Sequence, residues 1–446
     1  MTTSHHKRWL APCITLALAA PGSALAQSAK EQELEARIAQ LERIVAQLSA
    51  QPPRQADAVQ QQVAPAAKPT EPADRPIQAG TLVPAASPGT RFGYGGFIKF
   101  DAMLTDTDSG KIADGGAGRM LHLPASIPVG GVAAVDPYTD FGAQFSRFWF
   151  SADHLTDGGD KVKAYIEADF FGGGSAGLGN ETATNTHGVT LRQAYVGWKE
   201  WLAGQAWSNF MDTAAMPEAV DFVGVTDGTV FVRQAQLRYS KGAWSFSLEN
   251  PQTTVSPFRN PGARYNSGDN AFPDFTARWQ RRGDWGHFSI AGLLRQFKVP
   301  SDYAQGASAS VSGRWNLGKQ DDLRYAVNYG RGLGRYLGFG ISPDVMMDAA
   351  GRLEPLVSLG GFVAWRHAFS ARLRSNLMLA AARFDNDTAL TGLGITRGTR
   401  SLHANLIYSP IPRLDIGAEL GWGERELENG QQGTLKRIHT SVKYSF

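Results

Sequence analysis

The feature that most constrains the fold is a period-two alternation of apolar and polar residues, which recurs in segments of about ten residues from Phe92 to the C-terminus. In segment 161–170, apolar residues at even positions alternate with Lys, Tyr, Glu and Asp at odd positions. Segments 322–330 and 413–423 divide in the same way. Because successive side chains of a strand point to opposite faces, each segment is expected to be a strand with one apolar and one polar face. Soluble β-sandwiches also alternate, so a second criterion is needed.

The spacing of the segments supplies that criterion. Sixteen candidate strands lie near 92–104, 144–154, 161–171, 189–199, 201–209, 229–240, 243–250, 273–281, 285–297, 308–317, 322–331, 353–369, 372–384, 400–409, 413–424 and 434–446. Long connections lie at 105–143, 172–188, 210–228, 251–272, 298–307, 332–352, 385–399 and 425–433, and they alternate with short turns. Outer-membrane barrels have this asymmetry, since their external loops are long and their periplasmic turns are short. The sequence therefore predicts an all-β fold, a 16-stranded antiparallel transmembrane β-barrel over 91–446, whose strands must close to satisfy their backbone groups.

The end of the chain agrees with this prediction. Ile438, Thr440, Val442, Tyr444 and Phe446 share one face of the last segment and end on a terminal aromatic residue. Such a strand resembles the signal that outer-membrane barrels present to their assembly machinery. We therefore expect the barrel-assembly machinery, through Phe446, and outer-membrane lipid as partners.

The N-terminal part contains three segments that do not belong to the barrel. Residues 1–26 form a predicted signal peptide, with a basic start, an apolar run and a small-residue cleavage site. Lipidation at Cys13, the only cysteine, would require the apolar run before it, whereas here the run follows. Residues 29–50 carry a heptad pattern and predict a coiled coil. Residues 51–90 are rich in Pro, Ala and Gln and predict an extended linker.

The sequence of the coiled coil carries signals for both two and three strands, and we favour three. Its β-branched a positions and Leu d positions favour two strands. Its Arg37–Glu42 segment resembles the short pattern of three-stranded coils. With a barrel embedded in the outer membrane of a Gram-negative bacterium, both termini are expected to face the periplasm, and the coiled coil with them.

Composition excludes several function classes. The formal net charge is +3, which gives no bulk attraction to nucleic acid. A single cysteine in the predicted signal peptide excludes disulfides, thiolate metal sites and cysteine nucleophiles from the mature chain. Outside the N-terminus, no apolar run approaches the roughly 20 residues of a spanning helix.

Motifs for catalysis or metal binding are weak. The glycine-rich segment 172–177 fits both G-x-S-x-G and G-x-G-x-x-G, but no predicted helix follows it. The nine histidines show no compact ligand spacing. Acidic residues at 106–108 and 385–387 are better explained as solvated loops than as cation sites. We therefore expect no catalytic residues, no metal and no cofactor, with a barrel-embedded hydrolase as a minor alternative.

Charges predicted to face the lumen are candidates for solute selection. Residues 91–446 hold 26 Arg and 10 Lys against 34 Asp and Glu, so selectivity must come from position rather than total charge. Strand parity places basic side chains inside the barrel as pore-lining, anion-guiding candidates, because rings of Arg or Lys select anions in pores. They are Arg147, Lys163, Arg278, Arg314, Arg324, Arg366 and Arg374. These charges could equally pair with the inward carboxylates, and parity leaves Arg192 and Arg233 ambiguous.

The third loop, residues 210–228, is the candidate constriction. It combines apolar residues with Asp212, Glu218 and Asp221, a mixture suited to packing inside a barrel. The first loop, residues 105–143, is longer and could equally narrow the pore or cover its mouth.

These segments also resemble a known family, the DcaP-like trimeric outer-membrane porins of Gram-negative bacteria. The motifs that carry the resemblance lie at 201–212, 217–222, 249–251, 329–338, 403–410 and 422–430, and the similarity covers essentially all of 91–446. The resemblance implies homotrimers and passive diffusion of small organic anions, notably dicarboxylates, through a basic constriction. The alternative is a non-conducting anchor or adhesin, whose coiled coil would bind a periplasmic partner.

Overall fold

The computed structural model describes residues 79–80, 89–131, 135–172 and 184–446. The predicted signal peptide, the predicted coiled coil, most of the predicted linker and most of the glycine-rich segment 172–177 lie outside these residues. Ala79–Gly80, within the predicted linker, forms the two-residue strand β1 and pairs with β2.

Sixteen strands form the barrel, as the sequence predicts. They are β2 (Thr90–Thr107), β4 (Arg147–Leu155), β5 (Lys161–Asp169), β6 (Thr190–Trp198), β7 (Trp201–Trp207), β8 (Arg233–Lys241), β9 (Trp244–Glu249), β12 (Asp274–Gly283), β13 (Gly286–Val299), β14 (Asp302–Leu317), β15 (Asp321–Arg331), β18 (Val357–Ala368), β19 (Leu373–Asp385), β20 (Thr396–Ile411), β21 (Leu414–Leu427) and β22 (Gln432–Ser445).

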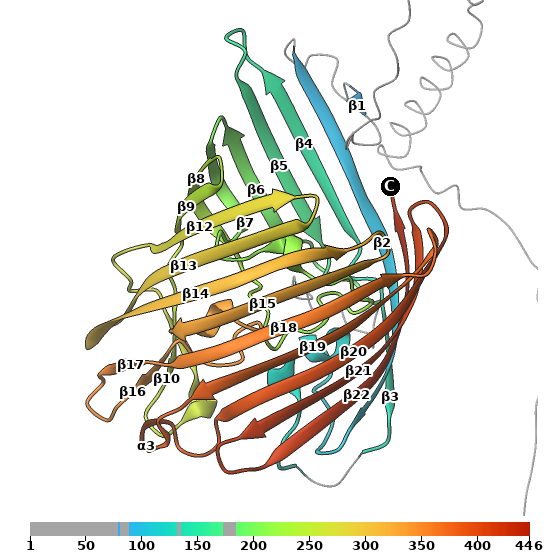
Figure 1. Ribbon diagram of the computed structural model, residues 1–446. Helices are drawn as coiled ribbons and strands as arrows, with labels where there is room; N and C mark the ends of the chain where they lie inside the picture. The colour runs from blue at the N-terminus through green and yellow to red at the C-terminus, as the bar shows by residue number, and fades with distance from the viewer. Residues whose placement is uncertain (1–78, 81–88, 132–134, 173–183) are drawn as a thin grey trace, which may run out of the picture. The chain divides into compact units, whose positions relative to one another are not determined.

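The sheet closes because the first and last barrel strands pair. Residues Phe97–Thr107 of β2 pair antiparallel with Leu435–Ser445 of β22, and the first half of β2 pairs with β4. In Figure 1 the red β22, the last of the group β20–β22, lies beside the blue β2. Closure leaves the barrel strands without a free edge, as a sheet in lipid requires.

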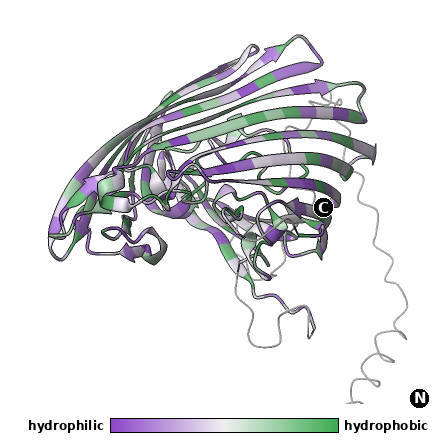
Figure 2. Ribbon diagram, turned by 90° about the horizontal axis from the view of Figure 1, so that it is seen from below, coloured by the Kyte–Doolittle hydropathy of each residue, from purple (hydrophilic) through white to green (hydrophobic). Residues whose placement is uncertain are grey.

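Apolar side chains cover the outer face of this sheet. The alternation of apolar and polar residues along each strand is visible in Figure 2. Trp244 is 52% exposed, Trp315 46%, Trp365 47% and Tyr444 48%. Several residues next to them in the chain, such as Arg314, Arg366 and Lys443, are charged. In a lipid bilayer, such exposed apolar residues form the membrane-facing surface and its aromatic girdles.

Two predicted long connections are wrong. The strands β21 and β22 extend to Leu427 and from Gln432, so the predicted connection 425–433 is reduced to residues 428–431. Residues 298–307 read as a long loop because they are small and polar, but β13 and β14 extend through them and leave only Pro300 and Ser301 between Val299 and Asp302. The ladder hydrogen bonds of a long antiparallel pair do not require large side chains, so a small-residue strand pairs as well as an apolar one.

The wall of the barrel is uneven in height. Strands β4–β9 have six to nine residues each, whereas β13 has 14 and β14 has 16. We call β4–β9 the short wall and β12–β22 the long wall.

The long connections contain short elements of their own. They are α2 (Ala117–Met120), η1 (Pro124–Ser126), β3 (Tyr138–Gly142), η2 (Thr213–Ala215), β10 (Thr253–Ser256), η3 (Pro261–Ala263), β11 (Tyr265–Ser267), η4 (Gly334–Tyr336), β16 (Val345–Met347), β17 (Leu353–Pro355) and α3 (Thr388–Thr391). Strands β10, β11, β16 and β17 form a second, four-stranded sheet. None of the helices in the part of the chain that the structure describes is long and apolar enough to cross a membrane.

Two loops fill part of the barrel interior. Phe210 of the third loop and Tyr336 of the sixth long loop, residues 332–356, pack with Leu293 of β13 in one buried apolar cluster. Arg295 of β13, whose side chain is 1% exposed, donates to Asp344 of the sixth loop and to Asp274 of β12. These contacts hold the loops against the long wall.

Candidate functional site

The third loop runs along the inner face of the long wall. It connects β7 to β8 across residues 208–232 and meets inward side chains of successive strands. Asp212 Oδ2 lies 2.8 Å from His287 Nε2 on β13 and accepts from Ser312 on β14 at 2.9 Å. Further along, Val220 N donates to Glu419 of β21 at 2.8 Å. The loop is therefore folded into the lumen.

Asp212 fixes the start of this path in two ways. Its side chain caps η2 by accepting from Ala214 N at 3.1 Å, and it binds His287 and Ser312 on the wall. Burial would raise the pKa of the Asp212 carboxyl, but the hydrogen bond and charge of His287 outweigh it, and the pKa lies below its ordinary value.

Glu218 occupies the middle of the path and binds two arginines of the long wall. Arg374 Nε donates to its two carboxylate oxygens at 2.8 and 2.9 Å, and Arg366 Nε lies 3.5 Å away. Burial would raise the pKa of Glu218, but the hydrogen bond from Arg374 dominates in the other direction and the pKa is lowered.

Four of the seven basic residues predicted for the lumen thus form hydrogen bonds or ion pairs with the third loop. Besides Arg366 and Arg374, Arg278 Nη1 donates to Met211 O at 2.8 Å and Arg324 Nη1 donates to Met216 O at 2.5 Å. These guanidinium groups support the loop as well as contributing positive charge to its surroundings.

The second half of the loop ends in a buried cluster around Asp221 and Asp227. His122 of the first loop donates its backbone N–H to Asp221 at 2.8 Å, and its Nε2 lies 3.3 Å from Asp227. For both Asp221 and Asp227, burial would raise the pKa, but neighbouring histidines outweigh it and the pKa is lowered.

Wall residues complete this cluster. His403 Nδ1 lies 2.8 Å from Glu419, and His439 Nε2 lies 2.8 Å from Asp101, which also binds Lys99. All of these side chains are nearly inaccessible. Unpaired buried charges are costly, so the cluster holds the first and third loops together against β2 and β20–β22. Both candidate loops therefore contribute to the filled side of the lumen.

Beside this cluster, three arginines and two carboxylates gather on the short wall. Arg147 donates to Glu167 at 3.0 Å and to Asp169 at 2.7 Å, and it lies over the ring of Phe222 from the third loop. Arg192, ambiguous by parity, pairs with Asp169 at 2.6 Å. A bulge between β5 and β6 at this point explains why parity fails there.

Arg233, the other ambiguous residue, has no carboxylate partner among the described residues. It stacks on Trp207, with its guanidinium carbon 3.5 Å from the ring centroid. Arg233 and Arg192 line a cavity of about 260 Å³. The other residues that line it are Leu121, Phe171, Leu191, Gln205, Phe222, Phe231, Val232 and Phe339.

The two remaining predicted residues are unpaired within the described part of the chain. Lys163 Nζ lies 5.5 Å from the ring of Tyr165. Arg314 lies opposite His287 and Arg324 in the ladders of its two neighbouring strands, and no ion pair joins it to a described residue.

Sequence reasoning missed His122, Asp227, His287, His403 and His439. The alternation already places His403 and His439 on inward faces, so the signal was present in part. The contact between these histidines could not be predicted from the sequence. His122 is 281 residues from His403 in the chain, whereas the centroids of the two rings lie 4.9 Å apart in the structure. No group of three or more His, Cys, Asp and Glu that could hold a metal ion occurs among the described residues.

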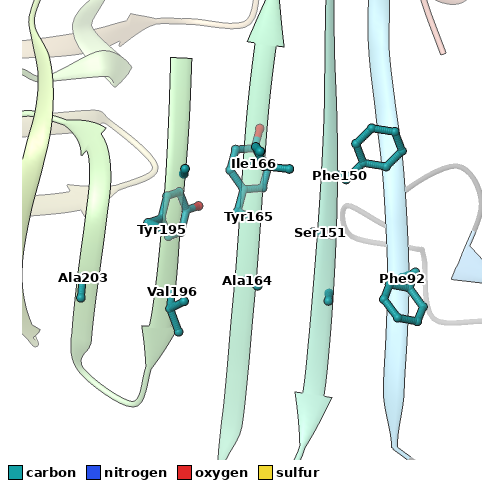
Figure 3. Close-up of a pocket in the computed structure, with 11 residues that line it drawn as sticks. Phe92, Phe150, Ser151, Ala164, Tyr165, Ile166, Tyr195, Val196 and Ala203 are labelled. Atoms are coloured by element: carbon teal, nitrogen blue, oxygen red, sulfur yellow. The ribbon is translucent and has the colours of Figure 1, made fainter. Parts of the chain in front are cut away.

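The outer face of the short wall carries a shallow groove of about 470 Å³ (Figure 3). Its lining includes the small residues Ala164 and Ala203 and the larger Phe92, Phe150 and Val196. Phe150 is 48% exposed and Val196 49%, so this apolar surface is unpartnered within the described chain.

Comparison with known proteins identifies the family. The family model described as "DcaP outer membrane protein" matches residues 22–446. The chain belongs to the DcaP outer membrane protein family. The resemblance drawn from the sequence motifs is thereby confirmed. No match was found among curated protein sequences.

Solved structures agree in fold. The outer membrane channel DcaP of Acinetobacter baumannii is 22% identical with a TM-score of 0.67, over 83% of this chain and 100% of that one. An anion-selective porin from Comamonas acidovorans is 9% identical with a TM-score of 0.50, over 80% and 100%. OmpT of Vibrio cholerae is 10% identical with a TM-score of 0.50, over 81% and 99%. The chain is thus a member of an outer membrane protein family, and the solved structures that resemble it share its barrel fold.

Proposed function

We propose that this protein is a passive outer-membrane porin that prefers small organic anions, such as dicarboxylates, and acts as a homotrimer. The observation that carries the anion preference is the surplus of arginine on the short-wall side. Arg147, Arg192 and Arg233 face only Glu167 and Asp169, and the Arg233 guanidinium has no carboxylate partner among the described residues. Guanidinium groups bind carboxylates bidentately and are positively charged at neutral pH.

The basic residues of the lumen then divide into two roles. Arg147, Lys163 and Arg314, together with Arg192 and Arg233, guide anions directly. Arg278, Arg324, Arg366 and Arg374 contribute charge to the lumen while they hold the third loop, and Asp212, Glu218 and Asp221 anchor that loop from its own side. In this proposal the third loop sets the narrowest level of the pore.

The proposed trimer uses the short wall. A membrane-spanning strand needs about 9–11 residues when tilted, but β7 has seven and β9 has six. A neighbouring subunit on this side would relieve the mismatch with the lipid, and the groove around Ala164 would accept its side chains. The predicted coiled coil, in the periplasm, would assist assembly, and Phe446 would present the last strand to the assembly machinery.

The test is reversal-potential measurement in planar bilayers under a salt gradient. The wild type should conduct in three correlated steps and favour anions. Replacing Arg192 and Arg233 by Gln should lower the anion-to-cation permeability ratio by roughly twofold or more. Arg372→Gln, in an exposed short turn, is the matched control and should leave the ratio unchanged.

An unchanged ratio in the double variant would refute the assignment of these arginines. Absence of conductance in the wild type would refute the porin itself and favour an anchor.

A further inference from the structure

A band of basic side chains lies on the outer face of the long wall, at the end that carries the long loops. Each shares its face with exposed apolar residues of the same strand and lies beyond the last of them. Its members are Lys298 on β13, Arg331 on β15, Arg383 on β19, Arg400 on β20 and Lys436 on β22. We call this set the basic band.

Neighbouring exposed residues establish the position of the band. Tyr329, which precedes Arg331 by two residues, is 59% exposed, and Leu379, which precedes Arg383 by four, is 48% exposed. Alternation places Arg331 and Arg383 on the same outer face as these residues. In outer-membrane barrels the long loops face the exterior, so the band lies at the level of the outer-leaflet headgroups.

The cations of the band are only partly balanced by the protein. Arg400 pairs with Glu424 at 2.9 Å. In contrast, the side chains of Lys298, Arg331 and Arg383 form no ion pair or hydrogen bond with any residue that the structure describes. Asp385 and Asp106 share the outer face near this level, which leaves more cations than carboxylates. External anions are the natural counterions for such a set.

An apolar groove of about 460 Å³ begins next to Arg331. Its floor contains Gly306 and Ala307 of β14. Beside the floor lie the side chains of Leu294, which is 56% exposed, and Phe272, which is 66% exposed. Gln296 fixes the Phe272 segment, because its Oε1 accepts from Ala271 N at 2.9 Å and from Phe272 N at 3.3 Å. A groove floored by small residues and ended by a cation suits a molecule with an acyl chain and an anionic head.

We propose that this groove and the basic band bind a phosphorylated glycolipid of the outer leaflet. The acyl chain lies between Phe272 and Leu294, and a sugar phosphate binds the guanidinium of Arg331, with Lys298 and Arg383 in support. Guanidinium recognises phosphate through paired, charge-assisted hydrogen bonds. The site lies outside the pore, so it does not depend on which solute the lumen selects.

The experiment uses the full-length protein in detergent micelles and fluorescently labelled, bis-phosphorylated lipid A as the probe. We expect Arg331→Gln to weaken binding about tenfold and Arg331→Lys to retain most of it. The matched control is Arg281→Gln, an exposed outward arginine on β12 near the short-turn end, which should bind like the wild type. Phosphatidylglycerol and dephosphorylated lipid A serve as competitors and should compete at least tenfold less well.

Equal binding by Arg331→Gln and the wild type would overturn the site. Equal competition by dephosphorylated lipid A would overturn the role of the phosphate, and equal competition by phosphatidylglycerol would overturn the assignment to a glycolipid. Conductance measured on the same samples should be unchanged in Arg331→Gln. A loss of conductance with intact lipid binding would instead concern the proposed porin function alone.

Discussion

Removing the charge of Glu218 should loosen the third loop while leaving the barrel intact. The carboxylate receives three hydrogen bonds from Arg374, at 2.5, 2.8 and 2.9 Å, and a longer contact from Arg366. Its side chain is 31% exposed, so each charge-assisted bond is partly screened by water. A hydrogen bond to a charged group contributes about 1.5–3 kcal/mol. For Glu218→Gln we take a net loss of about 2 kcal/mol, equivalent to a roughly 30-fold larger population of loop conformations detached at this point.

The loop retains its other anchors, at Asp212, Val220, Asp221 and Asp227, so complete release is not expected. Single-channel recording in planar bilayers should therefore show the wild-type mean conductance with increased current noise. The variant also removes one negative charge beside the pore, which should shift the reversal potential toward anions. Glu354→Gln, an exposed carboxylate in β17 outside these contacts, is the control. Wild-type noise together with a wild-type reversal potential in Glu218→Gln would refute the anchoring role.

Three further predictions concern pH, stability and assembly. The pKa of Glu218 in the folded protein lies below its ordinary value of 4.5, so its anchoring of the third loop is present above that value and lost as the pH falls through the lower folded pKa. The current noise of the wild type should therefore rise in acid. A Glu218→Gln variant with the same acid response would contradict this origin. His403→Leu leaves Glu419 buried without its imidazole partner and should destabilise the barrel by about 3 kcal/mol. The variant should unfold at a lower temperature than the control Ala404→Ser, which lies on the outer face. Equal unfolding temperatures would argue against a stabilising role of the buried cluster. Ala164→Trp should fill the groove of the short wall, so that cross-linking yields monomers. The control Ala309→Trp, on the long wall, should still yield trimers. Intact trimers from both variants would place the interface elsewhere.

Alternation together with the spacing of the segments was enough to predict the barrel. The 16 strands, their antiparallel order and the asymmetry of their connections all follow from residues close together in the chain, because strand geometry is local and a bilayer admits only a closed sheet. Of the two wrong connections, 298–307 is a stretch where small residues weaken the contrast between the two faces. Parity likewise placed Arg278, Arg324, Arg366 and Arg374 inside, and the structure brings all four to the third loop.

What the side chains do inside the barrel was decided only by the tertiary structure. Parity states that an arginine points inward, but it cannot state whether a carboxylate from a loop more than a hundred residues away meets it there, as Glu218 meets Arg374. The buried cluster of His122, Asp227 and His403 depends in the same way on two loops and a strand that come together only when the sheet closes. Local periodicity therefore determined the wall of this protein, and the long-range pairing of charges determined which part of its lumen is filled and which part carries free positive charge.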